Sequence, residues 1–365
     1  MLFVSFVVHE IKAIMPSYSH GNLNSWRKKL MRSRNSHHLA FLIGLILLLL
    51  SRSSFCQSLD RVRVGLSALS PTNWAVWVAE EKGLFKKHGI DAQVIFIGGG
   101  GARGMNALIA KDVQFMIIGG VGVINAALRG IDVAMVASNV NLSTQRLMSR
   151  PEIKTPDDLR GKRVGVTAFG SNTHSVLLML LKRWSMKPED VVILQIGPSP
   201  TMILSLEKHL IDAAVLTSPS DFIAEEKGNR TLADLADMKL YSLQGTLSTS
   251  REYLRSSDDQ ATRFIRGYSE GIAFIKRNKA QSIEVLRKKL RLDHSQSQYV
   301  EKTYTLYASK YLDQIPYVSL QGVKTLLDFI APDFPKAKSA DAESFIDARI
   351  VKQLENSGFY TKLYQ

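Results

Sequence analysis

Hydrophobic and polar positions follow two alternating periods from Arg61 onward. Short β-branched runs, such as residues 62–67 and 133–138, have the length of buried strands. Between such runs, apolar residues recur at three- and four-residue steps, as they do from Trp74 to Phe85, and this spacing predicts amphipathic helices. The alternation predicts βα units built around largely parallel sheets.

The predicted elements fall into three groups along the chain. The first group has strands at 62–67, 93–97, 113–118 and 133–138 and helices at 74–87, 102–110 and 121–128. The second has a short helix start at 155–158, strands at 163–167, 191–196 and 213–217, and helices at 171–184, 200–209 and 220–227. The third has helices only, at 258–276, 279–290, 295–309, 320–330 and 341–354.

Two extended stretches, at 143–150 and 241–248, separate these groups. A chain of 365 residues is long enough for two cores. We therefore predict two hinge-connected α/β lobes. The first is discontinuous (57–145 with 246–365), the second is 146–245, and the C-terminal helices pack on the first lobe.

A similar three-residue segment ending in aspartate recurs between a helix and the next strand. It is Gly89-Ile-Asp91, Ala110-Lys-Asp112, Gly130-Ile-Asp132 and Leu210-Ile-Asp212. The repetition indicates that the units in both lobes are built alike.

An export signal is predicted before the first lobe. Arg32 and Arg34 precede twelve apolar residues, 39–50, which are too few to span a bilayer but match a signal-peptide core. Ser54 and Cys56 place small residues before a cut at Gln57, and this pattern predicts an extracytoplasmic, periplasmic location. The alternatives are a lipid anchor on Cys56 and an uncleaved membrane anchor. A start at Met31 would give a leader of ordinary length, so we interpret residues 1–30 as a gene start assigned too far upstream.

Charge and composition exclude several classes of function. The formal net charge is +14, but residues 1–56 hold seven Lys or Arg and one acid, so residues 57–365 carry about +8. Those remaining basic residues are interspersed with acids, which is typical of solvated helix faces and not of a nucleic-acid site. The one cysteine is Cys56, and the later histidines lack metal-ligand spacing, so no cofactor or metal is predicted.

Several segments resemble the nitrate, sulfonate and taurine family of periplasmic binding proteins, which includes binding proteins for a thiamine precursor. The matching stretches are residues 74–91, 159–166, 210–216, 316–319 and 345–347. The resemblance implies the type II periplasmic-binding fold and the role of a solute-binding protein of an ABC importer. Its partners would be a small-molecule solute and the membrane permease, with the protein acting as a monomer.

Loops that follow strands are the expected ligand site, because ligands of α/β sheets bind at the carboxyl ends of strands. Residues 169–173 are the most informative, since hydroxyls and free helix N–H groups together favour an anion such as a sulfonate, nitrate or carboxylate. Ser171 or Asn172 could instead only cap the helix. Trp74 could supply an aromatic wall of the cleft or belong to the core, and Arg103 could pair with an acidic ligand or be a solvated surface residue. The predicted ligand-binding residues are Ser67, Ser70, Thr72, Asn73, Trp74, Gly99, Gly119, Gly120, Thr167, Phe169, Gly170, Ser171, Asn172, Thr173 and Ser218.

Two further functions compete with the binding protein. Gly99, Gly101 and Gly104 satisfy the G-x-G-x-x-G spacing of a dinucleotide-binding enzyme, but the next strand ends in Gly119 and not in a ribose-binding acid. The other alternative is a sensory module that reports to a partner protein. Catalytic residues are not predicted, because the sequence has no P-loop, zinc-protease or nucleophile-elbow motif.

Overall fold

The first sheet takes its strands from two distant parts of the chain. The structure is a computed structural model that describes residues 58–365, so the predicted leader lies outside the described residues. The sheet order is β2-β1-β3-β10-β4, and β10 runs against the other four strands. The bounds are β1 Asp60–Leu66, β2 Ile90–Phe96, β3 Phe115–Ile118, β4 Val133–Ser138 and β10 Thr246–Ser250.

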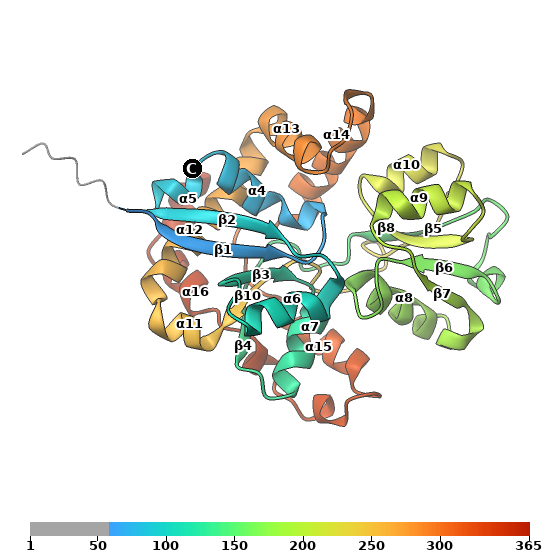
Figure 1. The fold of residues 1–365 in the computed structure, drawn as a ribbon, viewed down its shortest axis with the longest axis horizontal. Helices are drawn as coiled ribbons and strands as arrows, with labels where there is room; N and C mark the ends of the chain where they lie inside the picture. Colours follow the sequence, from blue (N-terminus) through green and yellow to red (C-terminus); the bar gives the residue numbers. More distant parts are fainter. Residues whose placement is uncertain (1–57) are drawn as a thin grey trace, which may run out of the picture. The chain divides into compact units, whose positions relative to one another are not determined.

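The second sheet repeats this order with strands from the middle of the chain. Its order is β7-β6-β8-β5-β9, and β5 is the one strand that runs against the rest. The bounds are β5 Gln145–Ser149, β6 Arg163–Val166, β7 Val192–Gln195, β8 Ala213–Thr217 and β9 Arg230–Asp234. Each crossing strand therefore enters the other lobe's sheet, next to its third strand (Figure 1).

Helices cover both faces of each sheet (Figure 1). Those between the strands are α4 Trp74–Glu81, α5 Leu84–Lys87, α6 Gly100–Ile109, α7 Gly120–Leu128, α8 Asn172–Arg183, α9 Ser199–Glu207 and α10 Ser220–Glu226. Those after β10 are α11 Arg251–Ser256, α12 Asp258–Arg277, α13 Lys279–Lys289, α14 Ser297–Leu306, α15 Leu320–Ile330, α16 Arg349–Asn356 and α17 Phe359–Tyr364. The 3-10 turns are η1 Pro71–Asn73, η2 Pro156–Leu159, η3 Pro188–Asp190, η4 His294–Gln296, η6 Pro335–Lys338 and η7 Ala342–Phe345, and η5 Tyr307–Tyr311 is a π-helix.

The fold confirms the prediction of two α/β lobes with C-terminal helices on the first. α12 packs so closely on α4 that a Cβ at Gly271 would collide with the carbonyl oxygen of Ala75. One of these helices also contacts the second lobe, since Tyr299 and Gln298 of α14 both donate to Glu226 of α10. The numbered lobe boundaries remain a proposal, which the distribution of strands between the two sheets supports.

Four apolar clusters fill the spaces between sheets and helices. In the first lobe, Trp74 and Phe264 belong to the cluster on one face of the sheet, and Ile118 and Leu326 belong to the cluster on the other. In the second lobe, α8 and α9 cover opposite faces and contribute Leu177 and Met202, respectively. Each sheet is thus buried on both faces, as continuous apolar strands predict.

The structure differs from the prediction at a few elements. The helix expected at 74–87 breaks at Gly83, whose φ of +69° is left-handed, and the one expected at 341–354 is a 3-10 turn followed by α16. β9, α11 and α17 were not predicted. Each sheet is mixed, with one antiparallel strand, because each crossing strand enters from the other lobe. Between residues 58 and 365, no helix has both the length and the apolar character needed to cross a membrane.

Candidate functional site

A cleft of about 540 Å³ lies between the two lobes, at the carboxyl ends of their strands. In the first lobe it is lined by residues that follow β1, β2 and β3, and in the second by residues that follow β6, β7 and β8. This is the position at which α/β sheets bind ligands. The lobes approach each other here at glycines, since a Cβ at Gly101 would stand 3.2 Å from the carbonyl oxygen of Gly170.

Six helices begin at the cleft, three from each lobe, since α4 and α10 start there as well as the four helices named next. The first residues of α6, α7, α8 and α9, or the residues just before them, line it. The N–H groups in the first turn of a helix have no partner within the helix, and the helix dipole favours negative charge there. The cleft is therefore electrostatically suited to an anion.

The N-terminus of α8 is held in place by two hydroxyls. Ser171 Oγ accepts hydrogen bonds from the backbone N–H groups of His174 and Ala168, at 3.4 Å each. Thr173 Oγ1 accepts from the N–H of Thr167 at 2.9 Å and lies 2.9 Å from Ser171 Oγ. Since one hydroxyl must donate to the other, the pair retains one hydroxyl hydrogen that a ligand could accept. Ser171 is thus a helix cap that also lines the cleft.

His174 stabilises the same loop as a neutral side chain. Its Nδ1 accepts a hydrogen bond of 3.2 Å from the N–H of Gly170, which requires that nitrogen to be unprotonated. Burial lowers the pKa of His174, so the ring is neutral at pH 7. It therefore adds no positive charge next to the cleft.

Three glutamines that the sequence analysis missed also line the cleft. Gln145 and Gln244 lie on the two crossings, and Gln195 ends β7. Gln195 could have been found by the strand-end rule, since it precedes a loop of the second lobe. The other two carry no such signal, because their position depends on how the crossing segments meet the two lobes.

Twelve of the fifteen predicted ligand-binding residues line the cleft. They are Ser67, Ser70, Thr72, Asn73, Gly99, Gly119, Thr167, Gly170, Ser171, Asn172, Thr173 and Ser218. Their contact with a ligand remains a prediction.

The other three predicted residues do not line the cleft. Trp74 is fully buried in the first lobe, where its Nε1 donates to the carbonyl oxygen of Ser282 at 3.0 Å, so an aromatic-wall role is corrected to a core role. Gly120 packs against Leu243 and Leu326. Phe169 is 59% exposed and points its ring to His174.

No charged side chain lines the cleft in the part of the chain that the structure describes. Arg103 is exposed, and its aliphatic carbons lie over Gly99, at the point where a Cβ would stand. Asp221 lies behind the wall, where its carboxylate accepts hydrogen bonds from Ser218 Oγ (2.9 Å) and Phe222 N–H (2.8 Å). No cluster of metal-binding side chains occurs among residues 58–365, and the cleft offers no acid to bind a ribose.

Comparison with known proteins agrees with this geometry. The model of the NMT1/THI5-like family matches residues 70–282. The taurine-binding periplasmic protein of Escherichia coli K12 is 35% identical over 136 residues, which is 37% of this chain. The matched stretch spans 41% of that protein's own length.

Solved structures with the same fold include binding proteins and an enzyme. The alkanesulfonate-binding protein SsuA from Xanthomonas axonopodis pv. citri, bound to MOPS, has a TM-score of 0.63 at 18% identity, over 80% of this chain and 96% of its own. The nitrate-binding protein NrtA from Synechocystis PCC 6803 has a TM-score of 0.67 at 10% identity, over 84% and 91%. The desulfurization enzyme DSZB has a TM-score of 0.60 at 14% identity, over 82% and 99%. These similarities show the shared fold, and the match to residues 70–282 shows that the chain belongs to the NMT1/THI5-like family.

Proposed function

We propose that this protein is the periplasmic solute-binding protein of an ABC importer that captures a small organic anion between its two lobes. The observation that carries the proposal is the convergence of six helix N-termini, three from each lobe, on one cleft. Among the similar proteins, those named for taurine, alkanesulfonate and nitrate support the anionic class. The protein would act as a monomer, and closure would present a surface that the permease recognises.

The mechanism would be closure about the two crossings between the lobes. A ligand that contacts residues of both lobes stabilises the closed state by its differential affinity for that state. Gln145 and Gln244 lie on the crossings themselves, so a ligand at this site touches the segments about which the lobes would turn.

Thermal denaturation with a panel of solutes tests the proposal. Nitrate, alkanesulfonates, taurine, aromatic carboxylates and pyrimidines would each be added to the purified protein. At least one anion is expected to raise the melting temperature in a saturable manner. A panel that produces no shift would contradict the proposal.

A double variant tests the α8 N-terminus. Ser171→Ala with Thr173→Ala is expected to weaken anion binding about tenfold, because the hydroxyl hydrogen that could bind the anion is lost. Loss of the cap costs about 1 kcal/mol, so the melting temperature without ligand should fall by only about 2–4 °C. Ser319→Ala is the matched control, since Ser319 caps α15 by accepting from Gly322 N–H at 3.2 Å and does not line the cleft. An equal loss of ligand affinity in the control would contradict the site.

An enzyme on the same fold is the second candidate, because the desulfurization enzyme shares the architecture. A related structure of that enzyme carries a cysteine-to-serine mutation, whereas this chain has no cysteine after Cys56. Saturable turnover of any solute in the panel, measured by product formation, would favour the enzyme.

A further inference from the structure

Two buried glutamines present unpaired amide groups to the cleft. Gln145 is 2% exposed and Gln244 is 8% exposed, and both line the cleft. The Oε1 of Gln244 accepts from the N–H and the hydroxyl of Thr144, at 2.8 Å each. Because a backbone N–H can only donate, the amide orientation of Gln244 is fixed and its NH₂ group points away from Thr144.

A backbone N–H fixes the amide of Gln195 in the same way, and the amide oxygen of Gln145 accepts from two side chains. Gln145 Oε1 accepts from Ser143 Oγ at 2.8 Å and from Asn172 Nδ2 at 3.3 Å. Gln195 Oε1 accepts from the N–H of Phe169 at 3.1 Å. The described residues provide no hydrogen-bond acceptor for the NH₂ group of any of the three glutamines. The cleft thus combines neutral donors with helix N-termini, and these groups can hold one negative charge without a cation.

The lining of the same cleft has no carboxylate for a positive charge, and one amide oxygen there, Asn172 Oδ1, is buried without a hydrogen-bond partner. A buried ammonium group requires a carboxylate or several carbonyl oxygens, and without them its burial is costly. Two carboxylates adjoin the lining in sequence. Asp221, next to Ser220, is 1% exposed and already accepts two hydrogen bonds, and Asp293, next to Leu292, is exposed and does not line the cleft. Arg146 does not line the cleft either and lies 3.5 Å from the carboxylate of Asp221.

One side of the cleft is apolar and open to solvent. Phe96 is 55% exposed and Leu69 is 45% exposed, although both line the cleft. Leu290 and Leu292, from the segment after α13, line it as well. Exposed large apolar side chains at the wall of a cleft are typical of a surface that a ligand covers.

We propose that the cleft selects organic monoanions that have an apolar body and no ammonium group. Gln145 and Gln244 would donate to the anionic oxygens, and Phe96 with Leu69 would cover the body. The inference rests on the proposed function and restricts the class of anion that the cleft would bind. It predicts that this protein rejects the zwitterion taurine, although a taurine-binding protein is among its relatives.

Calorimetric titration of the purified protein with three sulfonates tests the ligand class. Taurine and 1-propanesulfonate have the same size and differ in an ammonium group against a methyl group, and 1-hexanesulfonate extends the body. The expected affinity order is hexanesulfonate, then propanesulfonate, then taurine, with taurine at least about tenfold weaker than propanesulfonate. Hexanoate, added as a fourth ligand, separates a carboxylate from a sulfonate head.

Two variants test the residues. Gln244→Glu keeps an acceptor for Thr144 but places a negative charge against the anion, so hexanesulfonate affinity should fall roughly 10- to 100-fold. Phe96→Ala should weaken hexanesulfonate about tenfold and leave propanesulfonate within about threefold, because only the longer body reaches that ring. Thermal denaturation without ligand checks that both variants fold.

The outcomes separate the two proposals. If no anion binds, the proposed function itself fails. If anions bind and taurine binds as tightly as propanesulfonate, only the ligand class proposed here is overturned. If Gln244→Glu folds and binds hexanesulfonate normally, the role of the glutamine is overturned.

Discussion

Each lobe has an arginine directly after its crossing strand, and in each lobe this arginine meets the aspartate that precedes the neighbouring strand. In the second lobe, Arg150 follows β5 and its N–H donates to the carbonyl oxygen of Asp212 at 3.0 Å. In the first lobe, Arg251 follows β10 and makes the same backbone bond with Asp132, also at 3.0 Å. The two aspartates end the three-residue segments that recur between helices and strands in the sequence. The same backbone hydrogen bond, from arginine to aspartate, therefore joins the end of the crossing strand to its neighbour in both lobes.

The two pairs differ in burial and in the partners around them. The side chain of Asp212 is 11% exposed and accepts three hydrogen bonds from Arg163, at 2.9 Å from the backbone N–H and at 3.0 Å from both Nε and Nη2. The side chain of Asp132 is 54% exposed and lies 3.7 Å from Arg251 Nε. The attraction between opposite charges is stronger in a buried site and is weakened by solvent in an exposed one. The ion pairs of Asp212 should therefore stabilise the second lobe more than those of Asp132 stabilise the first.

The largest effect is expected at Asp212. Arg163 holds the pKa of this carboxyl at about 2, below its ordinary value of 3.8, and the difference corresponds to about 2 kcal/mol. Asp212→Asn should lower the free energy of unfolding at pH 7 by about this amount, as measured by urea denaturation. Asp157→Asn in the same lobe is the control, because that side chain is 83% exposed. If Asp212→Asn lowers the unfolding free energy no more than the control does, the buried aspartate is not the stronger of the two pairs.

The same contribution should disappear in acid. The folded-state pKa of Asp212 is depressed, so its stabilisation is fully present above pH 3.8 and is lost as the pH falls toward 2. The difference in unfolding free energy between the native protein and Asp212→Asn should therefore shrink over this interval. A difference that is constant between pH 5 and pH 2.5 would mean that the aspartate acts through packing and not through its charge.

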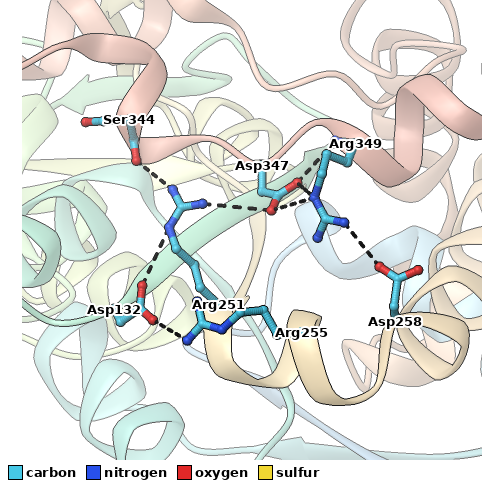
Figure 2. Close-up of polar contacts among 7 residues, drawn as sticks. All are labelled: Asp132, Arg251, Arg255, Asp258, Ser344, Asp347 and Arg349. Carbon is cyan, nitrogen blue, oxygen red and sulfur yellow. Dashed lines mark hydrogen bonds and ion pairs between the residues drawn. The ribbon is translucent and has the colours of Figure 1, made fainter.

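A smaller effect is expected in the first lobe. Figure 2 shows Asp132 paired with both Arg251 and Arg255, and Arg255 Nη2 lies 3.0 Å from Asp132 Oδ2. Because Asp132 and Arg255 are largely exposed, Asp132→Asn should cost less than about 1 kcal/mol at low salt and almost nothing at 1 M salt. Urea denaturation at both salt concentrations measures this. A cost equal to that of Asp212→Asn would show that burial is not what distinguishes the lobes.

The smallest effect is expected at Arg349, which belongs to the group of polar contacts drawn in Figure 2. Arg349 bonds to Asp347 at 3.1 Å and lies 3.4 Å from Asp258, and 60% of its side chain is exposed (Figure 2). Arg349→Ala should change the unfolding free energy by about 0.5 kcal/mol or less. A loss above 1 kcal/mol would indicate that the cluster acts as one cooperative network.

The strands that could be predicted well are those buried on both faces. β4 and β8 have the predicted bounds, because every residue in them is buried and each is an apolar run that ends in a single hydroxyl residue. β9 was missed, because it is an edge strand whose residues are mostly half-exposed and include charged residues at both ends. The sequence indicated the crossing segments, but not where each would insert in the opposite sheet, since that depends on pairing between distant residues.

The candidate site was predictable where it depends on strand ends. The loops after β1, β3 and β6 line the cleft because chain direction alone brings strand ends together. Trp74 was misplaced because it continues the apolar stripe of its helix and also adjoins a cleft loop, and only packing against Tyr304 and Tyr307 decides its direction. Gln145 and Gln244 were missed because their amides reach the cleft only through the assembled crossings.

The place of β10 in the first sheet has a consequence for how the chain is completed during synthesis. β4 pairs with β10 and with no other strand of that sheet, so residues 133–138 must wait for residues 246–250. The second sheet needs only residues 145–234, which are made without interruption. As the ribosome releases the chain from its N-terminus, the second lobe is therefore the first to have all its strands. The lobe that is begun first is finished last.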